Sequence, residues 1–82
     1  MSDMESNEII EKLNAVFRDV FDDEGISVGP GTTAKDIDGW DSLIHITLIN
    51  AVEDEFDVKF EMKDVVGFKN VGDMIEAIKK EL

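Results

Sequence analysis

Apolar residues recur at helical spacing in separate stretches of this 82-residue chain, and this pattern most limits the fold that the chain can adopt. Residues three and four positions apart share one face of an α-helix. The first stretch predicts an amphipathic helix over residues 6–21, with Ser6 or Asn7 as its N-cap. Its inward face is expected to consist of Ile9, Leu13, Val16, Phe17, Val20 and Phe21.

Two further amphipathic helices are predicted in the second half of the chain. One starts at Asp41 or Ser42 and ends near Glu55. The last helix follows Asn70 as its N-cap, with Asp73 three residues later. The expected apolar stripes are Leu43, Ile46, Ile49 (or Leu48), Val52 and Phe56 in the one, and Val71, Met74, Ile75, Ile78 and Leu82 in the other.

The stretch between these two helices is less regular. Apolar and polar residues alternate over residues 56–62, as in a strand, but a lone strand has no partner for its backbone hydrogen bonds. We therefore expect an extended linker there. Residues 63–69 predict one short helical turn, which Gly67 weakens. Met62 and Met74 are expected to fill the core.

Glycine and proline interrupt the helical pattern after residue 21. Gly29, Pro30 and Gly31 fall within a stretch that predicts a long loop over residues 22–41. A connection of this length is unusual in a compact domain and often serves a function. The residues expected to attach the loop to the core are Ile26, Val28 and Ile37. Together these elements predict an all-α fold, a small four-helix bundle with three longer helices and one short helix, in a single domain spanning residues 1–82.

Charge is distributed unevenly along the chain, which carries a net charge of −12. Residues 1–57 hold 15 acidic and 3 basic side chains, whereas residues 58–82 hold 5 of each. Nucleic acids and anionic membranes require a basic patch, so we expect either basic protein partners or a bound cation instead. No apolar run approaches the ~20 residues of a membrane span, and residues 1–8 lack the apolar region of a secretory signal. A cytoplasmic monomer is expected.

The most unusual local sequence runs from Asp38 to Leu43, where the long loop meets the second helix. Asp41 is well placed to cap the helix, and Ser42 then occupies the first helical position with its hydroxyl directed outward. A helix N-terminus offers unpaired N–H groups and partial positive charge, which suits a phosphate on Ser42. Gly39 allows a tight turn before the cap, and Trp40 is expected to anchor the loop on the bundle.

The stretch Gly39-Trp40-Asp41-Ser42-Leu43, followed by Ile46 and by Val52-Glu53-Asp54-Glu55-Phe56, resembles the acyl carrier proteins. Asp-Ser-Leu at the start of the second helix is the signature of that family. The resemblance covers nearly the whole chain, which it identifies as a single acyl-carrier domain. It implies that a phosphopantetheinyl transferase attaches 4′-phosphopantetheine from coenzyme A to Ser42. The thiol of this arm carries acyl groups as thioesters, so the absence of cysteine is no obstacle.

The resemblance also implies roles for the neighbouring residues. Asp41 is expected to lie beside the phosphate, and Leu43 and Ile46 are expected to contact partner enzymes. Glu53 and Asp54 would face basic patches on acyl-transferring or synthase enzymes. Acyl chains are expected to enter between the helices, with candidate lining residues Ile46, Ile49, Phe60, Met62 and Ile75.

Two departures from the fatty-acid carriers bear on the pathway. Those carriers often have further acids directly after the signature, whereas this chain has none between Asp41 and Glu53. Trp40 is also not the usual residue before the signature. Both features favour a carrier dedicated to a specialised pathway. Fatty acyl, polyketide and amino acyl cargo all stay open, and an amino-acyl or peptidyl carrier is the alternative.

The same residue types also occur in sites of other functions. Asp41, Ser42 and His45 have the residue types of a hydrolase triad, but they lie within one turn without a nucleophile elbow, so no enzyme activity is expected. His45 is expected to be a partly exposed helix residue. An EF-hand aligned on Gly39 would place Ala34 and His45 at the end positions, so no calcium loop is predicted. A further alternative is an acidic helical adaptor in which Ser42 is never modified.

Overall fold

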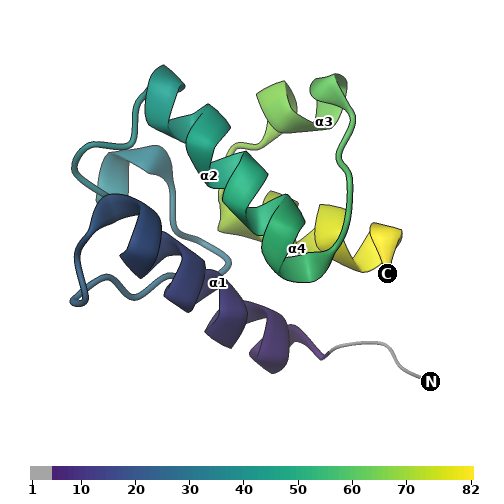
Figure 1. The fold of residues 1–82 in the computed structure, drawn as a ribbon, viewed down its shortest axis with the longest axis horizontal. Coiled ribbons are helices and arrows are strands. Elements are labelled where there is room, and N and C mark those ends of the chain that lie inside the picture. Colours follow the sequence, from purple (N-terminus) through teal and green to yellow (C-terminus); the bar gives the residue numbers. More distant parts are fainter. Residues whose placement is uncertain (1–4) are drawn as a thin grey trace.

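The computed structural model describes residues 5–82, and every regular element in this range is helical. The all-α fold of three longer helices and one short helix is confirmed (Figure 1). The predicted loop over residues 22–41 is also present, with one 3₁₀ turn inside it. The elements are α1 (Ser6–Phe21), the 3₁₀ turn (Ala34–Asp36), α2 (Ser42–Phe56), α3 (Met62–Gly67) and α4 (Val71–Glu81).

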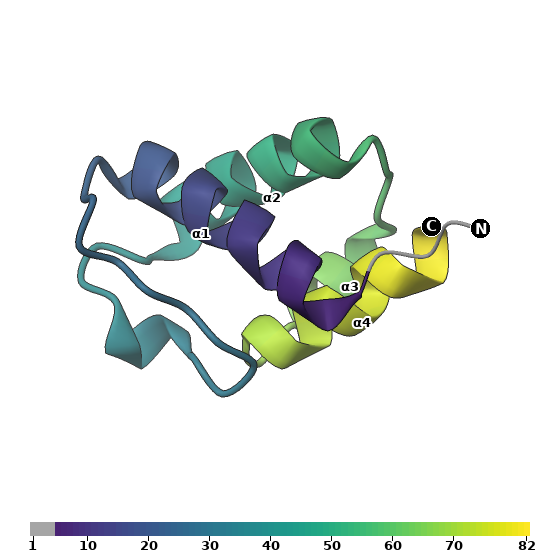
Figure 2. The ribbon, with the colours of Figure 1, turned by 90° about the horizontal axis from the view of Figure 1, so that it is seen from below.

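Helices α1 and α2 form the main packing unit. They lie side by side and run in opposite directions, and the long loop joins them at one end of the molecule (Figure 1, Figure 2). Helix α4 packs against α1, and α3 sits beside the linker that follows α2. The start of α2, and with it Ser42, therefore lies at the end of the molecule where the loop returns to the bundle.

The core forms where the apolar faces of these helices meet. Helix α1 contributes the face that its spacing predicts, with Phe17 fully buried and Phe21 half-buried at its edge. Burying side chains of this size supplies most of the stabilising free energy of a small domain. The buried residues are Ile9, Leu13, Val16, Phe17, Val28, Leu48, Ile49, Val52, Phe56, Val58, Val65, Val71, Met74, Ile75 and Ile78.

The buried face of α2 differs from the predicted inward stripe. Leu43 is 84% exposed and Ile46 is 50% exposed, whereas Leu48 and Ile49 are both buried. The first turns of α2 are apolar on nearly every side, so periodicity alone does not identify the face that packs. Two other predicted core residues, Met62 and Leu82, are exposed because they lie at the ends of their helices, while Met74 is buried as predicted.

The helix ends are set by side-chain caps. The N-cap of α1 is Glu5, not Ser6 or Asn7, because Glu8 closes a capping box by accepting the Glu5 backbone N–H at 3.5 Å. Ser6 and Asn7 already lie inside the first turn. The predicted cap of α4 is confirmed, since Asn70 Oδ1 accepts the Asp73 N–H at 2.9 Å.

The long loop is held against both α1 and α4. Asn14 on α1 accepts the Val28 N–H at 2.6 Å, and Val28 is buried as predicted. Ile26 and Ile37 are partly buried against the core, also as predicted. Farther along, the loop carbonyl groups bond to the first N–H groups of α4: Val71 N–H donates to Thr32 O and Gly72 N–H to Pro30 O, each at 2.8 Å.

We predict that Asn14→Ala lowers the free energy of unfolding by about 1–3 kcal/mol, because it leaves the Val28 N–H without its partner. Urea unfolding at neutral pH measures this change. Asn50→Ala is the matched control, since Asn50 is an exposed helical residue whose replacement should change stability by less than about 0.5 kcal/mol. Equal stability of the two variants would contradict the anchoring role of Asn14.

Candidate functional site

The start of α2 is fixed by Asp41. This residue has extended backbone geometry, and its Oδ1 accepts the N–H groups of Leu43 and Ile44, both at 3.0 Å. The first N–H groups of a helix have no partner within the helix, so an N-cap carboxylate stabilises the start. The structure thus places Asp41 at the predicted cap position and Ser42 at the first residue of α2.

Ser42 is exposed on this helix start. Its hydroxyl is therefore accessible to another protein, and a group on its Oγ would lie at the positive end of the α2 dipole. These features fit a phosphate ester on Ser42. The neighbouring carboxylates of Asp38 and Asp41 are exposed to solvent, which weakens their repulsion of such a group.

Gly39 and Trp40 set the direction from which the chain enters the site. Gly39 has a φ of 89°, a backbone conformation that favours glycine, so the predicted tight turn is confirmed. The Trp40 ring packs edge-on against Phe17 and Phe21, with centroid distances of 5.3 and 6.2 Å. The predicted role of Trp40 as a loop anchor is thereby confirmed, and Asp41 follows directly from this anchored residue.

A groove of about 480 Å³ lies beside Ser42. It is formed by the start of α2, the 3₁₀ turn and α3, and its walls are mainly apolar. The lining residues are Ala34, Trp40, Asp41, Ser42, His45, Ile46, Val65, Val66 and Phe68. Of the predicted cargo-lining residues, Ile46 lines this groove, whereas Met62 is exposed and Ile49 and Ile75 belong to the packed core.

His45 links three segments around this groove, a role that the sequence did not indicate. Its Nδ1 accepts the Trp40 indole N–H at 3.0 Å, and its Nε2 lies 3.2 Å from the Val65 carbonyl oxygen on α3. The ring also stacks on Trp40. The half-buried position agrees with the expectation of a partly exposed residue, but the contact with α3 spans 20 residues of sequence and has no local signal.

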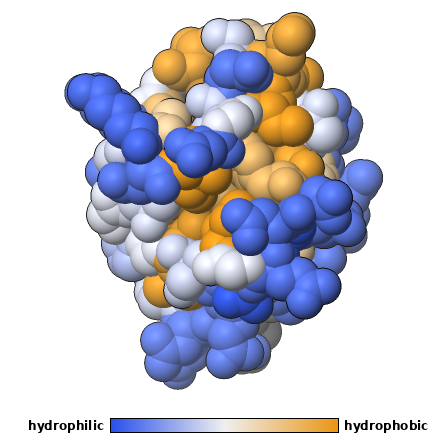
Figure 3. All heavy atoms as spheres, turned by 90° about the vertical axis from the view of Figure 1, so that its left-hand side faces the viewer, coloured by the Kyte–Doolittle hydropathy of each residue, from blue (hydrophilic) through white to orange (hydrophobic). Residues whose placement is uncertain are grey.

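The predicted docking residues fall into two places on α2. Leu43 and Ile46 are exposed close to Ser42, and apolar surface borders hydrophilic side chains on the face that corresponds to the left of Figure 1 (Figure 3). Glu53 and Asp54 lie about 17 Å from Ser42 along the helix axis. Asp54 is exposed, whereas Glu53 is partly buried and accepts the Phe60 N–H at 2.8 Å.

Within residues 5–82 no group of three or more His, Cys, Asp or Glu side chains is arranged to hold a metal ion. In the same range, no helix has both the length and the apolar character needed to cross a membrane.

We predict that Asp41→Ala lowers the free energy of unfolding by about 1 kcal/mol, because the N–H groups of Leu43 and Ile44 lose their acceptor. Asp41→Asn, which keeps an oxygen acceptor, should retain most of the stability. Urea unfolding of both variants separates the cap from the charge. An Asn variant as unstable as the Ala variant would show that the charge, not the cap, is what stabilises the site.

Comparison with known proteins agrees with this geometry. The family model of the phosphopantetheine attachment site matches residues 11–78. Acyl carrier proteins from Clostridium perfringens strains SM101 and 13 are each 33% identical over 70 residues, which cover 85% of this chain and 92% of theirs. The solution NMR structure of holo acyl carrier protein from Geobacter metallireducens has a TM-score of 0.82 and 40% identity, covering 89% of this chain and 84% of that chain. The chain belongs to the acyl carrier protein family.

Proposed function

We propose that Ser42 is the residue of this acyl carrier protein that carries 4′-phosphopantetheine. The observation that supports this assignment is the exposed serine at the capped start of α2, within the range matched by the phosphopantetheine attachment model. Ser42 Oγ would form the phosphate ester, in a reaction catalysed by a separate phosphopantetheinyl transferase. The attached group supplies a thiol on a flexible arm, and this thiol holds acyl intermediates as thioesters.

The residues around Ser42 would orient the group rather than perform chemistry on it. Asp41 fixes the helix start through its two bonds to the backbone, and Gly39 keeps the turn before it compact. The partial positive charge of the α2 N-terminus would stabilise the phosphate. Because Asp41, Ser42 and His45 form no triad geometry, with His45 bonded to Trp40 and Val65 instead, we infer a carrier without catalysis of its own.

Partner enzymes are proposed to dock along the exposed side of α2. Leu43 and Ile46 would supply apolar contacts beside Ser42, and Asp54 would face basic side chains of the partner. Attraction between such exposed charges accelerates association and is weakened by salt, which suits a carrier that visits several enzymes. Glu53 would have one carboxylate oxygen left for this surface, since the other accepts the Phe60 N–H.

The specialised pathway is a proposal that rests on the sequence of the first turns of α2. These turns carry no acidic side chain after Asp41, so the negative charge of the docking surface is confined to the far end of the helix. We infer a dedicated set of partners that recognise α2 through apolar contacts at Leu43 and Ile46 more than through charged contacts. The chain is proposed to work as a monomer.

We predict that incubation with coenzyme A and a broad-specificity phosphopantetheinyl transferase adds the mass of one phosphopantetheine group to the chain. Ser42→Ala should remain folded and gain no mass, because the accepting hydroxyl is gone. Ser27→Ala is the matched control, since Ser27 is an exposed loop serine, and it should be modified like the wild type. Intact-mass spectrometry and circular dichroism provide the measurements.

Two results of this experiment would contradict the assignment. Modification of Ser42→Ala would place the group on another residue. A folded wild type that no transferase modifies would favour the acidic helical adaptor instead.

We predict that Asp54→Lys lowers kcat/KM of modification about two- to fivefold at low salt, because it replaces attraction to a basic partner with repulsion. Glu53→Gln, which keeps an oxygen to accept the Phe60 N–H, should have a smaller effect. Glu11→Lys makes the same change of net charge on exposed α1 and serves as the control. Equal loss in Glu11→Lys and Asp54→Lys would reduce the effect to net charge and contradict a docking site on α2.

A further inference from the structure

Helix α3 packs less extensively against the bundle than the other helices do. It has six residues, of which Val65 is the only buried one, and it makes few close backbone contacts with the other helices. The last four carbonyl groups of a helix accept no hydrogen bond from within that helix. Val65 lies close enough to the end of α3 for its carbonyl to be one of them. An outside donor to this carbonyl would therefore both satisfy it and hold α3 in place.

His45 is positioned to be this donor. Its Nε2 lies 3.2 Å from the Val65 oxygen, and its Nδ1 lies 3.0 Å from the Trp40 indole nitrogen. The indole N–H only donates, so Nδ1 must accept and carries no proton. In neutral imidazole the proton is then on Nε2, where it donates to Val65. One neutral tautomer thus satisfies both contacts at once.

The other end of this hydrogen-bonded series is rigid. Trp40 packs against the buried Phe17 of α1 and against Phe21, so its indole N–H has a fixed position. The indole in turn fixes the position of the His45 ring, which stacks on it with a centroid distance of 6.0 Å. The series therefore runs from the core at α1 through the loop and α2 to α3. All three members, Trp40, His45 and Val65, line the groove that contains Ser42.

We propose that His45 is a positioning residue of the carrier site. Through Trp40 and the Val65 carbonyl it holds α3 against the start of α2, and so maintains the groove in which a short acyl thioester is sheltered from water. The proposal rests on the attachment of phosphopantetheine to Ser42. Loss of the series would let α3 move away from the start of α2 and widen the groove that Ile46 and Val66 line, so that a thioester held there would meet more water.

Protonation of His45 should break the series at one defined contact. Imidazolium carries a proton on both nitrogens, so Nδ1 could no longer accept the Trp40 N–H, whereas Nε2 would still donate to Val65. Protonation would therefore break the contact on the loop side of the series and leave the contact with α3 intact.

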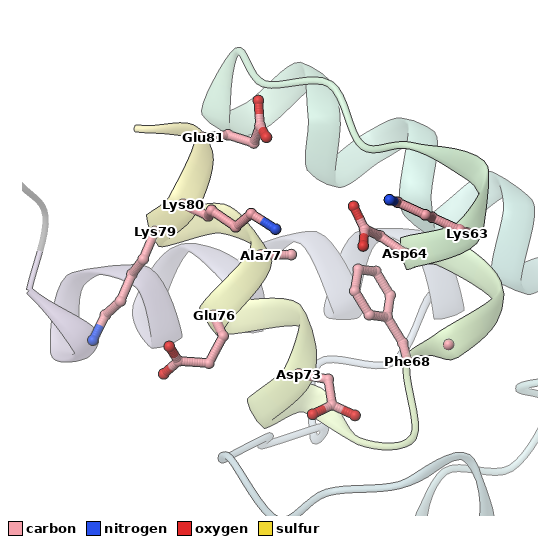
Figure 4. Close-up of a pocket in the computed structure, with 10 residues that line it drawn as sticks. Lys63, Asp64, Phe68, Asp73, Glu76, Ala77, Lys79, Lys80 and Glu81 are labelled. Atoms are coloured by element: carbon pink, nitrogen blue, oxygen red, sulfur yellow. The ribbon is translucent and has the colours of Figure 1, made fainter.

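The ionisable groups around His45 are few. Asp41 at the start of α2 is the other ionisable residue lining the groove, and the 3₁₀ turn contributes Ala34 to it. On α3, Lys63 and Asp64 line a different groove of about 580 Å³ between α3 and α4, where their side chains lie near the Phe68 ring (Figure 4). The charged groups of α4 that line that second groove are Asp73, Glu76, Lys79, Lys80 and Glu81.

The test compares two variants of the full chain loaded with a butyryl thioester from butyryl-coenzyme A by the transferase. His45→Phe keeps a ring but removes both hydrogen bonds, and should hydrolyse the thioester about fivefold faster. His45→Gln keeps one acceptor and one donor in a neutral side chain, and should stay close to the wild-type rate. Trp40→Phe, which keeps the aromatic packing but lacks the indole N–H, is a second loss variant should His45→Phe fail to fold.

Two readouts apply to the unmodified chain as well. Nitrogen chemical shifts of the imidazole should show the Nε2–H tautomer at neutral pH. Because Trp40 is the only tryptophan and the chain has no tyrosine, its fluorescence reports its contact with His45. His45→Phe should change that fluorescence, because the indole N–H loses its acceptor, and His45→Gln should change it less.

A neutral imidazole with its proton on Nδ1 would overturn the proposal, as would equal thioester lifetimes in the wild type and in a folded loss variant. Failure of the transferase to load the wild type would instead overturn the attachment to Ser42. The tautomer and fluorescence measurements distinguish the two failures, because they need no attached group.

Discussion

The burial of the apolar face of α1 is the constraint on which the rest of the structure depends. Phe17 and its neighbours pack against α2 and α4, and the same face receives Trp40 from the end of the loop. Because Trp40 directly precedes the capping residue Asp41, the core also decides where α2 begins. Ser42 is thus a surface residue whose position is set by buried contacts, and the flexible arm proposed for it would extend from a fixed base.

The features of the site that were predictable from the sequence are local ones. The cap at Asp41, the turn at Gly39 and the cap at Asn70 depend on residues within four positions of one another, and all three were predicted correctly. Local rules were less decisive at Ser6. Serine is the better capping residue type, but Glu5 is the N-cap because the Glu8 carboxylate accepts its backbone N–H.

The features that the sequence missed depend on distant partners. The exposure of Leu43 and Ile46, which the family resemblance implies but the apolar spacing does not, reflects where α1 covers α2, and nothing in the nearly uniform apolar pattern of the first turns indicates that boundary. The contact between His45 and the Val65 carbonyl, like that between Glu53 and the Phe60 N–H, joins a side chain to a backbone group of another segment. Nearly every residue type has the same backbone groups, so the sequence does not indicate which of them such a side chain will contact.

The hydrogen bonds from the start of α4 constrain the middle of the long loop but not its first residues. Gly72 approaches Pro30 so closely that a Cβ atom would lie 2.9 Å from its carbonyl oxygen. The chain around Pro30 and Thr32 is therefore held by α4, whereas residues 22–25 are exposed. Evolution has room to lengthen the loop directly after α1, but an insertion in its middle would disturb the two hydrogen bonds that join the loop to α4.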